Sequence, residues 1–304
     1  VSLKKKKKYY RHYKYKYKQR NETMKKWAKN YEELILKSTE YSGSREPNAK
    51  ILSASSINKE NYYLMNQYNF EKKKQDSFGA NTIGSIFQLG IDAAIQKHDK
   101  EGRYEFGRRM TLPLDNGWTI SGELDVFDKI ENVIIDNKVV SDYAMKDINK
   151  NTPDSDYNLQ VATYVMLDHM NKSEEDMLRG KVHQEPAAGA LAIVNKGGSA
   201  VKNNIYTTLE LNMYTPEDML FMYQEKAKEL QHYIDTNTMP EEVCDTAKFG
   251  MEKGVPKRCM LYCDFRDVCP NYSKYKKLTD RKIAEGLNSN IEKEKSVYIK
   301  PMEF

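Results

Sequence analysis

The sequence lacks the features that mark membrane, secreted and disulfide-stabilised proteins. It contains no stretch of about 18 consecutive apolar residues, so we expect no membrane span. Its first residues are mainly Lys and Tyr, without the apolar region of a secretory signal. Four Cys among 304 residues are too few for a disulfide scaffold. The sequence therefore predicts a soluble intracellular protein, with enough chain for one large domain or two smaller ones.

Histidine is also scarce, and its five copies show none of the spacings typical of metal ligands. We therefore assign no chemistry to these residues, which are His12, His98, His169, His183 and His232.

Charge is distributed unevenly along the chain. The net charge is +5, yet residues 1–26 hold twelve Lys and Arg and a single acid, so the remainder is net acidic. Because these lysines repel one another and accompany no apolar face, we expect residues 1–26 to form a disordered basic tail. Tyr and Lys alternate over residues 13–18, which suits contacts to nucleic-acid bases and phosphates. The alternatives are a solubilising extension, or translation from Met24.

Hydrophobic periodicity predicts a mixed α/β domain over residues 27–243, followed by a C-terminal segment, residues 244–304. An Asp-Asn-Gly turn at residues 115–117 predicts a β-hairpin. Thr215 and Pro216 are a typical N-cap and first residue of a helix. The serines of residues 51–58 are expected to cap the next helix. Expected helices span residues 24–36, 82–98, 156–170 and 216–235, and expected strands span residues 104–112, 118–128, 133–140, 187–195 and 205–211.

Two carboxylates and a lysine lie on neighbouring expected strands. Asp125 is on the second strand of the hairpin and Asp136 on the following strand, so the turn between them can bring the two together. Asp136 and Lys138 are two residues apart and share a strand face with Ile134. We expect the opposite face, which carries Val133, Ile135 and Val139, to point toward the core.

Converging carboxylates suit a hard cation such as Mg²⁺ or Mn²⁺. A neighbouring lysine can orient the attacking water and stabilise charge on phosphoryl oxygens. The competing interpretation is an ordinary surface strand, because an Asp-x-Lys triplet arises by chance in a chain with 31% charged residues.

Four motif blocks, taken in order, resemble the PD-(D/E)XK nucleases, specifically the RecB-like exonuclease branch that includes the AddB nuclease domain and CRISPR adaptation nucleases. Each block is weak alone, and the ordered set is stronger. The blocks are the Ser-x-Ser segment in residues 51–58, a Gly-x-x-x-His-like helix at 84–92, the Gly-x-x-Asp and Asp-x-Lys strands at 122–125 and 136–138, and a Gln-x-x-x-Tyr helix at 160–164.

The resemblance implies a restriction-endonuclease-like core, a small mixed sheet flanked by helices. It also implies two overlapping sets of site residues. The catalytic set is Asp125, Asp136, Lys138, Gln160 and Tyr164, of which the last two would position the scissile strand or the lysine. The metal ligands would be Asp125, Asp136, the main-chain carbonyl of Asn137, and Gln88.

One position departs from the family pattern. Gln88 stands where this branch usually has a metal-binding His, and a neutral amide oxygen binds a hard cation weakly. Asp92, one helical turn later, would contribute through a bridging water. We therefore expect weaker binding of the metal, or a single tight site.

All four cysteines fall within 26 residues, as Cys244, Cys259, Cys263 and Cys269. Clustered thiols in an intracellular protein usually indicate a metal. This block resembles the C-terminal cysteines of iron–sulfur nucleases, although the family's first cysteine lies upstream and Cys244 would have to replace it. A 4Fe-4S cluster is the first expectation, with structural Zn²⁺ or metal-free thiols as alternatives. Either metal would clamp the C-terminal segment onto the nuclease domain.

The resulting hypothesis is a Mg²⁺- or Mn²⁺-dependent deoxyribonuclease, an exonuclease acting on single- or double-stranded DNA in recombination, repair or phage genome processing. By the resemblance, it would work in the cytoplasm of a bacterial cell or phage-infected host, with a helicase or recombination protein as a partner. The alternative is a catalytically weak or inactive nucleic-acid-binding or scaffolding module of the same fold. A third reading is a site-specific endonuclease.

Overall fold

The computed structural model describes residues 46–70, 80–178, 185–196 and 206–241, with residues 251–252, 255–256, 263, 265, 268 and 269. The expected basic tail and the expected helix over residues 24–36 lie outside the described residues. The chain divides into two compact units, residues 1–43 with 77–91 and residues 44–76 with 92–304. The boundaries expected at residues 26 and 243 stay predictions. Among the described helices, none has both the length and the apolarity needed to cross a bilayer.

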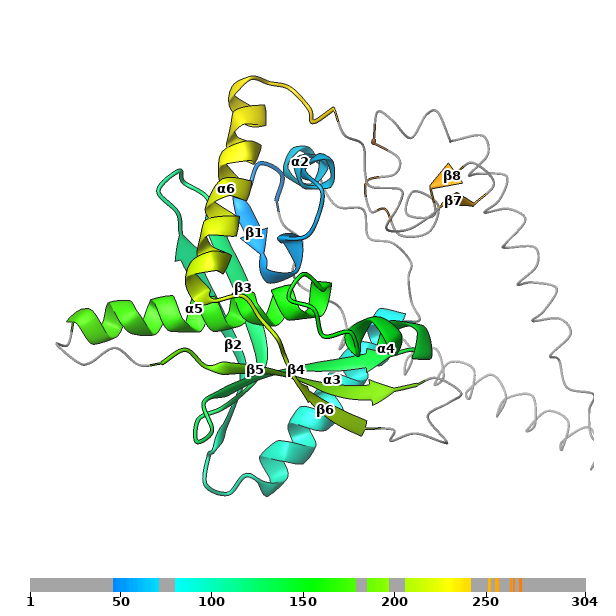
Figure 1. Cartoon of the computed structure of the whole chain (residues 1–304), viewed down its shortest axis with the longest axis vertical. Coiled ribbons are helices and arrows are strands. Elements are labelled where there is room, and N and C mark those ends of the chain that lie inside the picture. The colour runs from blue at the N-terminus through cyan, green and yellow to red at the C-terminus, as the bar shows by residue number, and fades with distance from the viewer. Residues whose placement is uncertain are drawn as a thin grey trace, which may run out of the picture. The chain divides into compact units, whose positions relative to one another are not determined.

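The second unit is built on a six-stranded mixed sheet (Figure 1). The strand order is β1-β3-β4-β5-β6, and β2 pairs with β3. The pairs β1/β3 and β4/β5 are parallel, whereas β2/β3, β3/β4 and β5/β6 are antiparallel. The strands are β1 (Ile51–Ser53), β2 (Tyr104–Pro113), β3 (Thr119–Asp128), β4 (Val133–Val140), β5 (Ala188–Asn195) and β6 (Tyr206–Glu210).

Helices flank this sheet, and α5 lies across it (Figure 1). The mixed α/β class and the flanking helices expected from the sequence are thereby confirmed. The helical elements are the 3-10 turn η1 (Ala54–Ser56), α2 (Asn61–Asn69), α3 (Ala80–His98), α4 (Asp142–Ile148), α5 (Asp156–Leu178) and α6 (Pro216–Asp235). Two short strands, β7 (Met251–Glu252) and β8 (Val255–Pro256), pair with each other. The part of α3 that ends at Ile91 belongs to the first unit.

Two local predictions are confirmed in atomic detail. In the β2–β3 turn, Gly117 adopts a φ of 79°, and the Trp118 main-chain nitrogen donates to Asn116 Oδ1 at 3.3 Å. Gly supplies this left-handed conformation without steric cost, which is why the Asn-Gly pair forms the turn. At the start of α6, Thr215 Oγ1 accepts a hydrogen bond from the Asp218 main-chain nitrogen at 3.2 Å, and Pro216 follows the cap.

The expected capping by serines is wrong. Helix α2 (Asn61–Asn69) has Glu60, not a serine, as its N-cap residue, and the Glu60 side chain makes no capping hydrogen bond. Ser56 is fully buried instead, and its hydroxyl donates to the Ser53 carbonyl at 2.6 Å. The hydroxyl is thus used within η1, because the chain turns inward there before α2 starts.

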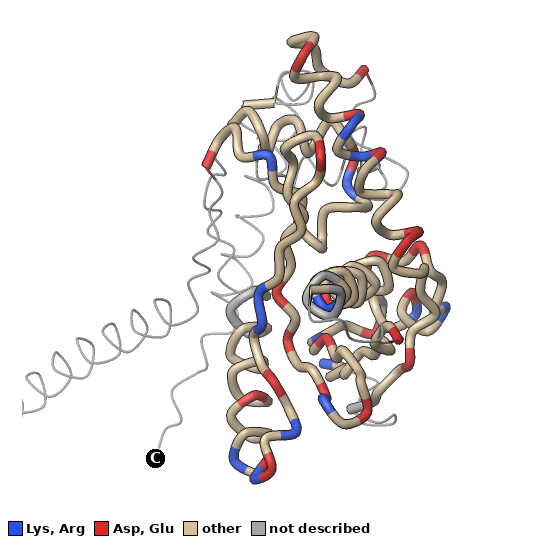
Figure 2. Tube along the Cα trace, turned by 90° about the vertical axis from the view of Figure 1, so that its left-hand side faces the viewer, with Lys and Arg blue, Asp and Glu red and all other residues tan. Residues whose placement is uncertain are grey.

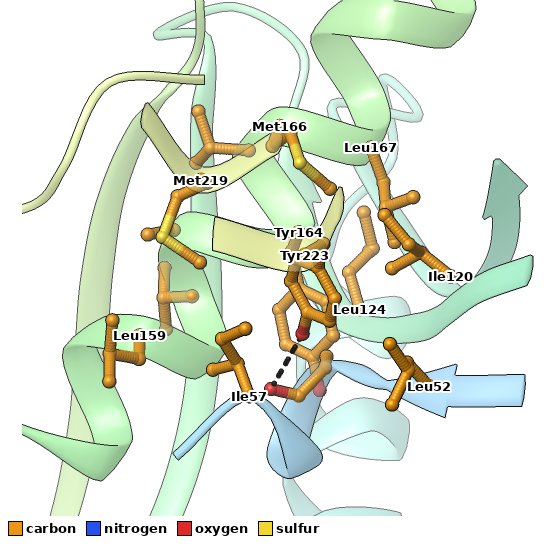
Figure 3. Packing of buried hydrophobic residues seen from close by; sticks show 14 of the residues in the cluster. Leu52, Ile57, Ile120, Leu124, Leu159, Tyr164, Met166, Leu167, Met219 and Tyr223 are labelled. Carbon is orange, nitrogen blue, oxygen red and sulfur yellow. Dashed lines mark hydrogen bonds between the residues drawn. The ribbon is translucent and has the colours of Figure 1, made fainter. Parts of the chain in front are cut away.

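The core lies between helices α5 and α6 and strands β1 and β3 (Figure 3). Leu52, Ile120 and Leu124 from the strands have no exposed surface, and Tyr223 of α6 is likewise fully buried. The Tyr223 hydroxyl donates to the Ser53 carbonyl at 3.0 Å, which satisfies a polar group in this core. The packing therefore ties α6 to the end of β1.

Candidate metal centre

The two carboxylates lie where strands β3 and β4 separate. Because β2 runs along one edge of β3, strands β1 and β4 share the other edge. β1 pairs with residues 119–121 and β4 with residues 126–128, so residues 122–125 have no partner on that edge among the described strands. Asp125 stands at the point where the two strands diverge, and the register continued by one residue places Asp136 opposite it. We call this opening the β3–β4 fork.

The other edge of β3 is irregular at the same position. The β2–β3 ladder omits one pair, the one that would join Gly107 to Asp125, and Gly107 has a φ of 62°. Burial alternates along β3 up to Leu124, whereas Val126 and the next two residues are all buried. Sequence analysis missed this feature, although a glycine inside a strand is a signal for a bulge.

Asp125 is held by the backbone of β4. Its Oδ2 accepts a hydrogen bond from the Asn137 main-chain nitrogen at 2.7 Å, where a regular ladder would use a carbonyl. Burial, followed by the negative charge of Asp136, raises the pKa of Asp125 to about 7. Lys138 and the Asn137 hydrogen bond act in the opposite direction, and Asp92 adds a smaller repulsion.

Asp136 is fully buried, and neither of its carboxylate oxygens accepts a hydrogen bond from the described part of the chain. The ammonium of Lys138 lies 2.6 Å from Asp136 Oδ2 as an ion pair outside hydrogen-bond geometry. Burial by itself lowers the pKa of Lys138, but the charges of Asp136 and Asp125 outweigh it, so the pKa stays above its ordinary value. The Lys138 side chain as a whole is 22% exposed.

The prediction of which face of β4 is buried is wrong. Ile134 and Asp136 have no exposed surface and Val140 is 4% exposed, whereas Val133, Ile135 and Val139 are only half-buried. The carboxylate therefore lies on the core face of the strand. Apart from residues 136–138, β4 is apolar on both faces, and the helix that packs on it decides which face is covered.

Gln160 and Tyr164 are joined on α5, as their spacing predicts. The Gln160 side-chain nitrogen donates to the Tyr164 hydroxyl at 2.6 Å. Tyr164 is 5% exposed, and burial together with the charge of Asp136 raises its pKa. Its ring lies against β3, because a Cβ built on Gly122 would come within 2.9 Å of Tyr164 Cδ1. Tyr164 therefore supports the site from inside the core.

Tyr157, one helical turn before Gln160, was not singled out from the sequence. It is half-buried, and burial raises the pKa of its phenol, with smaller effects of Lys138, which lowers it, and of Asp136. The start of α5 therefore lies within electrostatic range of the lysine.

The close approach at Gly122 gives a testable expectation. Gly122→Ala forces its new methyl group against Tyr164 and Leu167, so we expect a loss of about 1–3 kcal/mol in the free energy of unfolding. Gly84→Ala is the matched control, because a Cβ there meets no described atom within 4 Å and the helix gains about 1 kcal/mol. Denaturant titration measures both; equal effects of the two variants would contradict the packing described.

The residues of the fork suit a divalent cation bound by oxygen. Asp136 is a buried carboxylate whose oxygens accept no hydrogen bond from the described residues, and Asp125 contributes a second carboxylate. In the described part, no group of three or more His, Cys, Asp or Glu side chains is arranged around one metal position. The described part of the fork thus offers two carboxylates as metal ligands. This number suits a cation that keeps several bound waters, as Mg²⁺ does. Gln88 belongs to the first unit, so its expected place among the ligands stays a prediction.

The cysteine site is only partly described. Cys244 and Cys259 lie outside the described residues, Cys263 is buried, and Cys269 is partly buried. The Cys269 sulfur lies 3.6 Å from the Tyr62 hydroxyl. The four-thiolate cluster therefore stays a prediction.

Charged residues of both signs are interspersed along the described trace (Figure 2). Several pair with each other. Arg103 binds Asp128 through Nε at 2.8 Å and Nη2 at 2.6 Å, and Asp128 Oδ1 also accepts from the main-chain nitrogens of Ile130 and Glu131. These bonds fix the turn that leads from β3 into β4, next to the fork. The Arg103 hydrogen bond holds the pKa of Asp128 below its ordinary value.

Comparison with solved structures gives twelve matching chains, and three of these distant similarities are as follows. The protein described as SSO0001 matches with 14% identity and a TM-score of 0.44, covering 78% of this chain and 95% of its own. A phage-related exonuclease from Haemophilus somnus 129PT matches with 14% identity and a TM-score of 0.35, covering 60% and 81%. An alkaline exonuclease from Laribacter hongkongensis matches with 8% identity and a TM-score of 0.39, covering 62% and 90%.

No protein-family model matches the sequence, and no curated protein matches it. Because all three TM-scores lie below 0.5, no activity is transferred from these proteins to this chain.

Proposed function

We propose that this chain is a Mg²⁺- or Mn²⁺-dependent DNA nuclease of the RecB-like type, and that the β3–β4 fork is its active site. The observation that carries the proposal is Asp136, a fully buried carboxylate without a hydrogen bond from any described residue. Burial of such a group is unfavourable unless a cation compensates it. Lys138 supplies one positive charge, while Asp125 adds a second negative one. With both carboxylates ionised the fork is net negative, and a bound divalent cation offsets this negative charge.

Each side chain then has a role that follows from its position. Asp125 and Asp136 hold the cation, and the Asn137 backbone fixes the orientation of Asp125. When bound, the cation lowers the pKa of its water and offsets the negative charge of the phosphate. The Lys138 ammonium, 2.6 Å from Asp136 Oδ2, stabilises the charge that develops on the phosphoryl oxygens. Gln160 is held in one orientation by its bond to Tyr164.

The direct test is cleavage of end-labelled linear DNA, single- and double-stranded, with Mg²⁺ or Mn²⁺. We expect Asp136→Asn to reduce cleavage to background and Lys138→Ala to lower kcat by about 10²–10³-fold, since it removes one charge-stabilising group. Lys150→Ala is the matched control, because Lys150 also contacts a carboxylate at 2.6 Å but its side chain is 66% exposed. It should cleave like the wild type.

Two further measurements separate the competing functions. Closed circular DNA that resists cleavage supports an end-dependent exonuclease, whereas its linearisation supports an endonuclease. Binding of Mn²⁺, followed by its electron paramagnetic resonance signal, tests the site without any reaction. A wild type that binds DNA but cleaves no better than Asp136→Asn would establish the binding module instead.

We propose further that the four cysteines hold a 4Fe-4S cluster, because they gather within 26 residues and the two described ones, Cys263 and Cys269, are six residues apart. Visible absorption of anaerobically purified protein, together with iron and zinc analysis, tests this. Colourless protein that contains zinc or no metal would contradict it.

A further inference from the structure

Two described residues of the C-terminal cysteine segment, Phe265 and Cys269, contact α2. Phe265 is 1% exposed, and its ring centroid lies 5.2 Å from that of Tyr63 at an interplanar angle of 68°, an edge-to-face contact. Aromatic rings favour this arrangement over a face-to-face one. The Lys59 ammonium lies 4.9 Å from the centre of the Tyr63 ring. Tyr63 is thus held by other contacts as well as by Phe265.

One turn of backbone orients this segment. The main-chain nitrogens of Val268 and Cys269 both donate to the Phe265 carbonyl, at 3.1 and 2.9 Å. Residues four apart in such a turn lie on the same side. Accordingly Cys269 also meets α2, where its sulfur lies 3.6 Å from the Tyr62 hydroxyl, while Val268 is 38% exposed.

We propose that Phe265 anchors the cysteine segment to α2, so that the segment stays docked when the cysteines carry no metal. A fully buried aromatic side chain changes an equilibrium by about a hundredfold. A thiol donates and accepts hydrogen bonds only weakly, so the Tyr62–Cys269 contact contributes far less. The inference depends neither on DNA cleavage nor on which metal the cysteines bind.

Hydrogen–deuterium exchange of α2 in the full-length protein tests the anchor. We expect Phe265→Ala to accelerate exchange over Asn61–Asn69 by at least about tenfold, because the ring that covers Tyr63 is lost. Val268→Ala, an exposed position of the same segment, is the matched control and should leave exchange unchanged. Phe265→Leu keeps much of the apolar volume and should lie between the two. Amides of β4 report global unfolding and should stay protected in every variant.

The same exchange assay tests separately whether a metal at the cysteines is needed to keep the segment docked on α2. Chelator-treated reduced protein, and the Cys244→Ser/Cys259→Ser variant, should both retain wild-type exchange in α2 within about twofold. If the purified protein holds no metal, its slow α2 exchange relative to Phe265→Ala demonstrates the same point. Acceleration of α2 exchange by metal removal alone would overturn the proposal, as would Phe265→Ala behaving like Val268→Ala.

Discussion

Asp125→Asn is expected to stabilise the metal-free protein while removing its function. At pH 8 we expect the free energy of unfolding to rise by about 2–4 kcal/mol, because the ionised Asp125 is partly buried beside Asp136 and its pKa is raised to about 7. Asparagine keeps an oxygen that accepts from the Asn137 nitrogen, so the hydrogen bond that orients this position is preserved.

The effect has a defined pH dependence. The folded-state pKa of about 7 lies above the ordinary value of 3.8, so between these values the folded state binds more protons than the unfolded state. Wild-type stability therefore falls as pH rises from about 4 to 7, relative to the variant, and the difference is constant above pH 7. Below pH 4 Asp125 is protonated in both the folded and the unfolded wild type, so the difference in stability between wild type and variant disappears.

Chemical denaturation of metal-free protein at several pH values measures this difference. Asp115→Asn, an exposed carboxylate in the β2–β3 turn, is the control and should show no such trend. Mg²⁺ should reverse the order, because it stabilises only the form that binds it. An unchanged stability of Asp125→Asn at pH 8 would show that the two carboxylates do not repel each other.

Lys138→Met is expected to have the opposite effect. It leaves Asp136 without its ion pair inside the protein, and removal of one partner from a buried pair costs about 3–5 kcal/mol. Methionine has a similar length, so little packing is lost. We therefore expect the metal-free variant to unfold at markedly lower denaturant concentration.

Lys150→Met is the matched control for Lys138→Met, because it also removes the positive charge of an ion pair. Its ammonium also lies 2.6 Å from a carboxylate, that of Asp147, but both side chains are more than half exposed. An exposed pair of this kind contributes about 1 kcal/mol or less. A second variant, Lys138→Met with Asp136→Asn, should recover most of the lost stability. Equal losses of stability in Lys138→Met and Lys150→Met would contradict the burial of the ion pair between Lys138 and Asp136.

The sequence predicts the elements whose signals are local. The Asn116-Gly117 turn, strand β4 and the start of α6 at Thr215 all lie where turn chemistry, apolar runs and capping residues place them. Short elements that depend on distant partners were not predicted. β1 is a strand of three residues because it pairs with Thr119–Ser121, and no periodicity exists over so short a length.

The candidate site shows the same division. The order of the motifs predicts that Asp125, Asp136 and Lys138 form one site, and in the structure these three side chains lie close enough to affect one another's charge. Sequence reasoning placed Asp136 on the less buried face, since charged residues normally avoid the core. The burial of this carboxylate follows from tertiary packing on β4, which no local pattern of residues encodes.

The branching of β3 also constrains the order in which the chain can fold. Asp136 pairs with Leu191 of β5, a residue synthesised much later than Asp125 and Lys138. A nascent chain that ends before β5 can form the β2–β3 hairpin, but it leaves β4 without its parallel neighbour and the acidic pair open to water. The two carboxylates can meet early, across the short turn between β3 and β4, but they are buried only at a later, long-range step, when β5 has paired with β4.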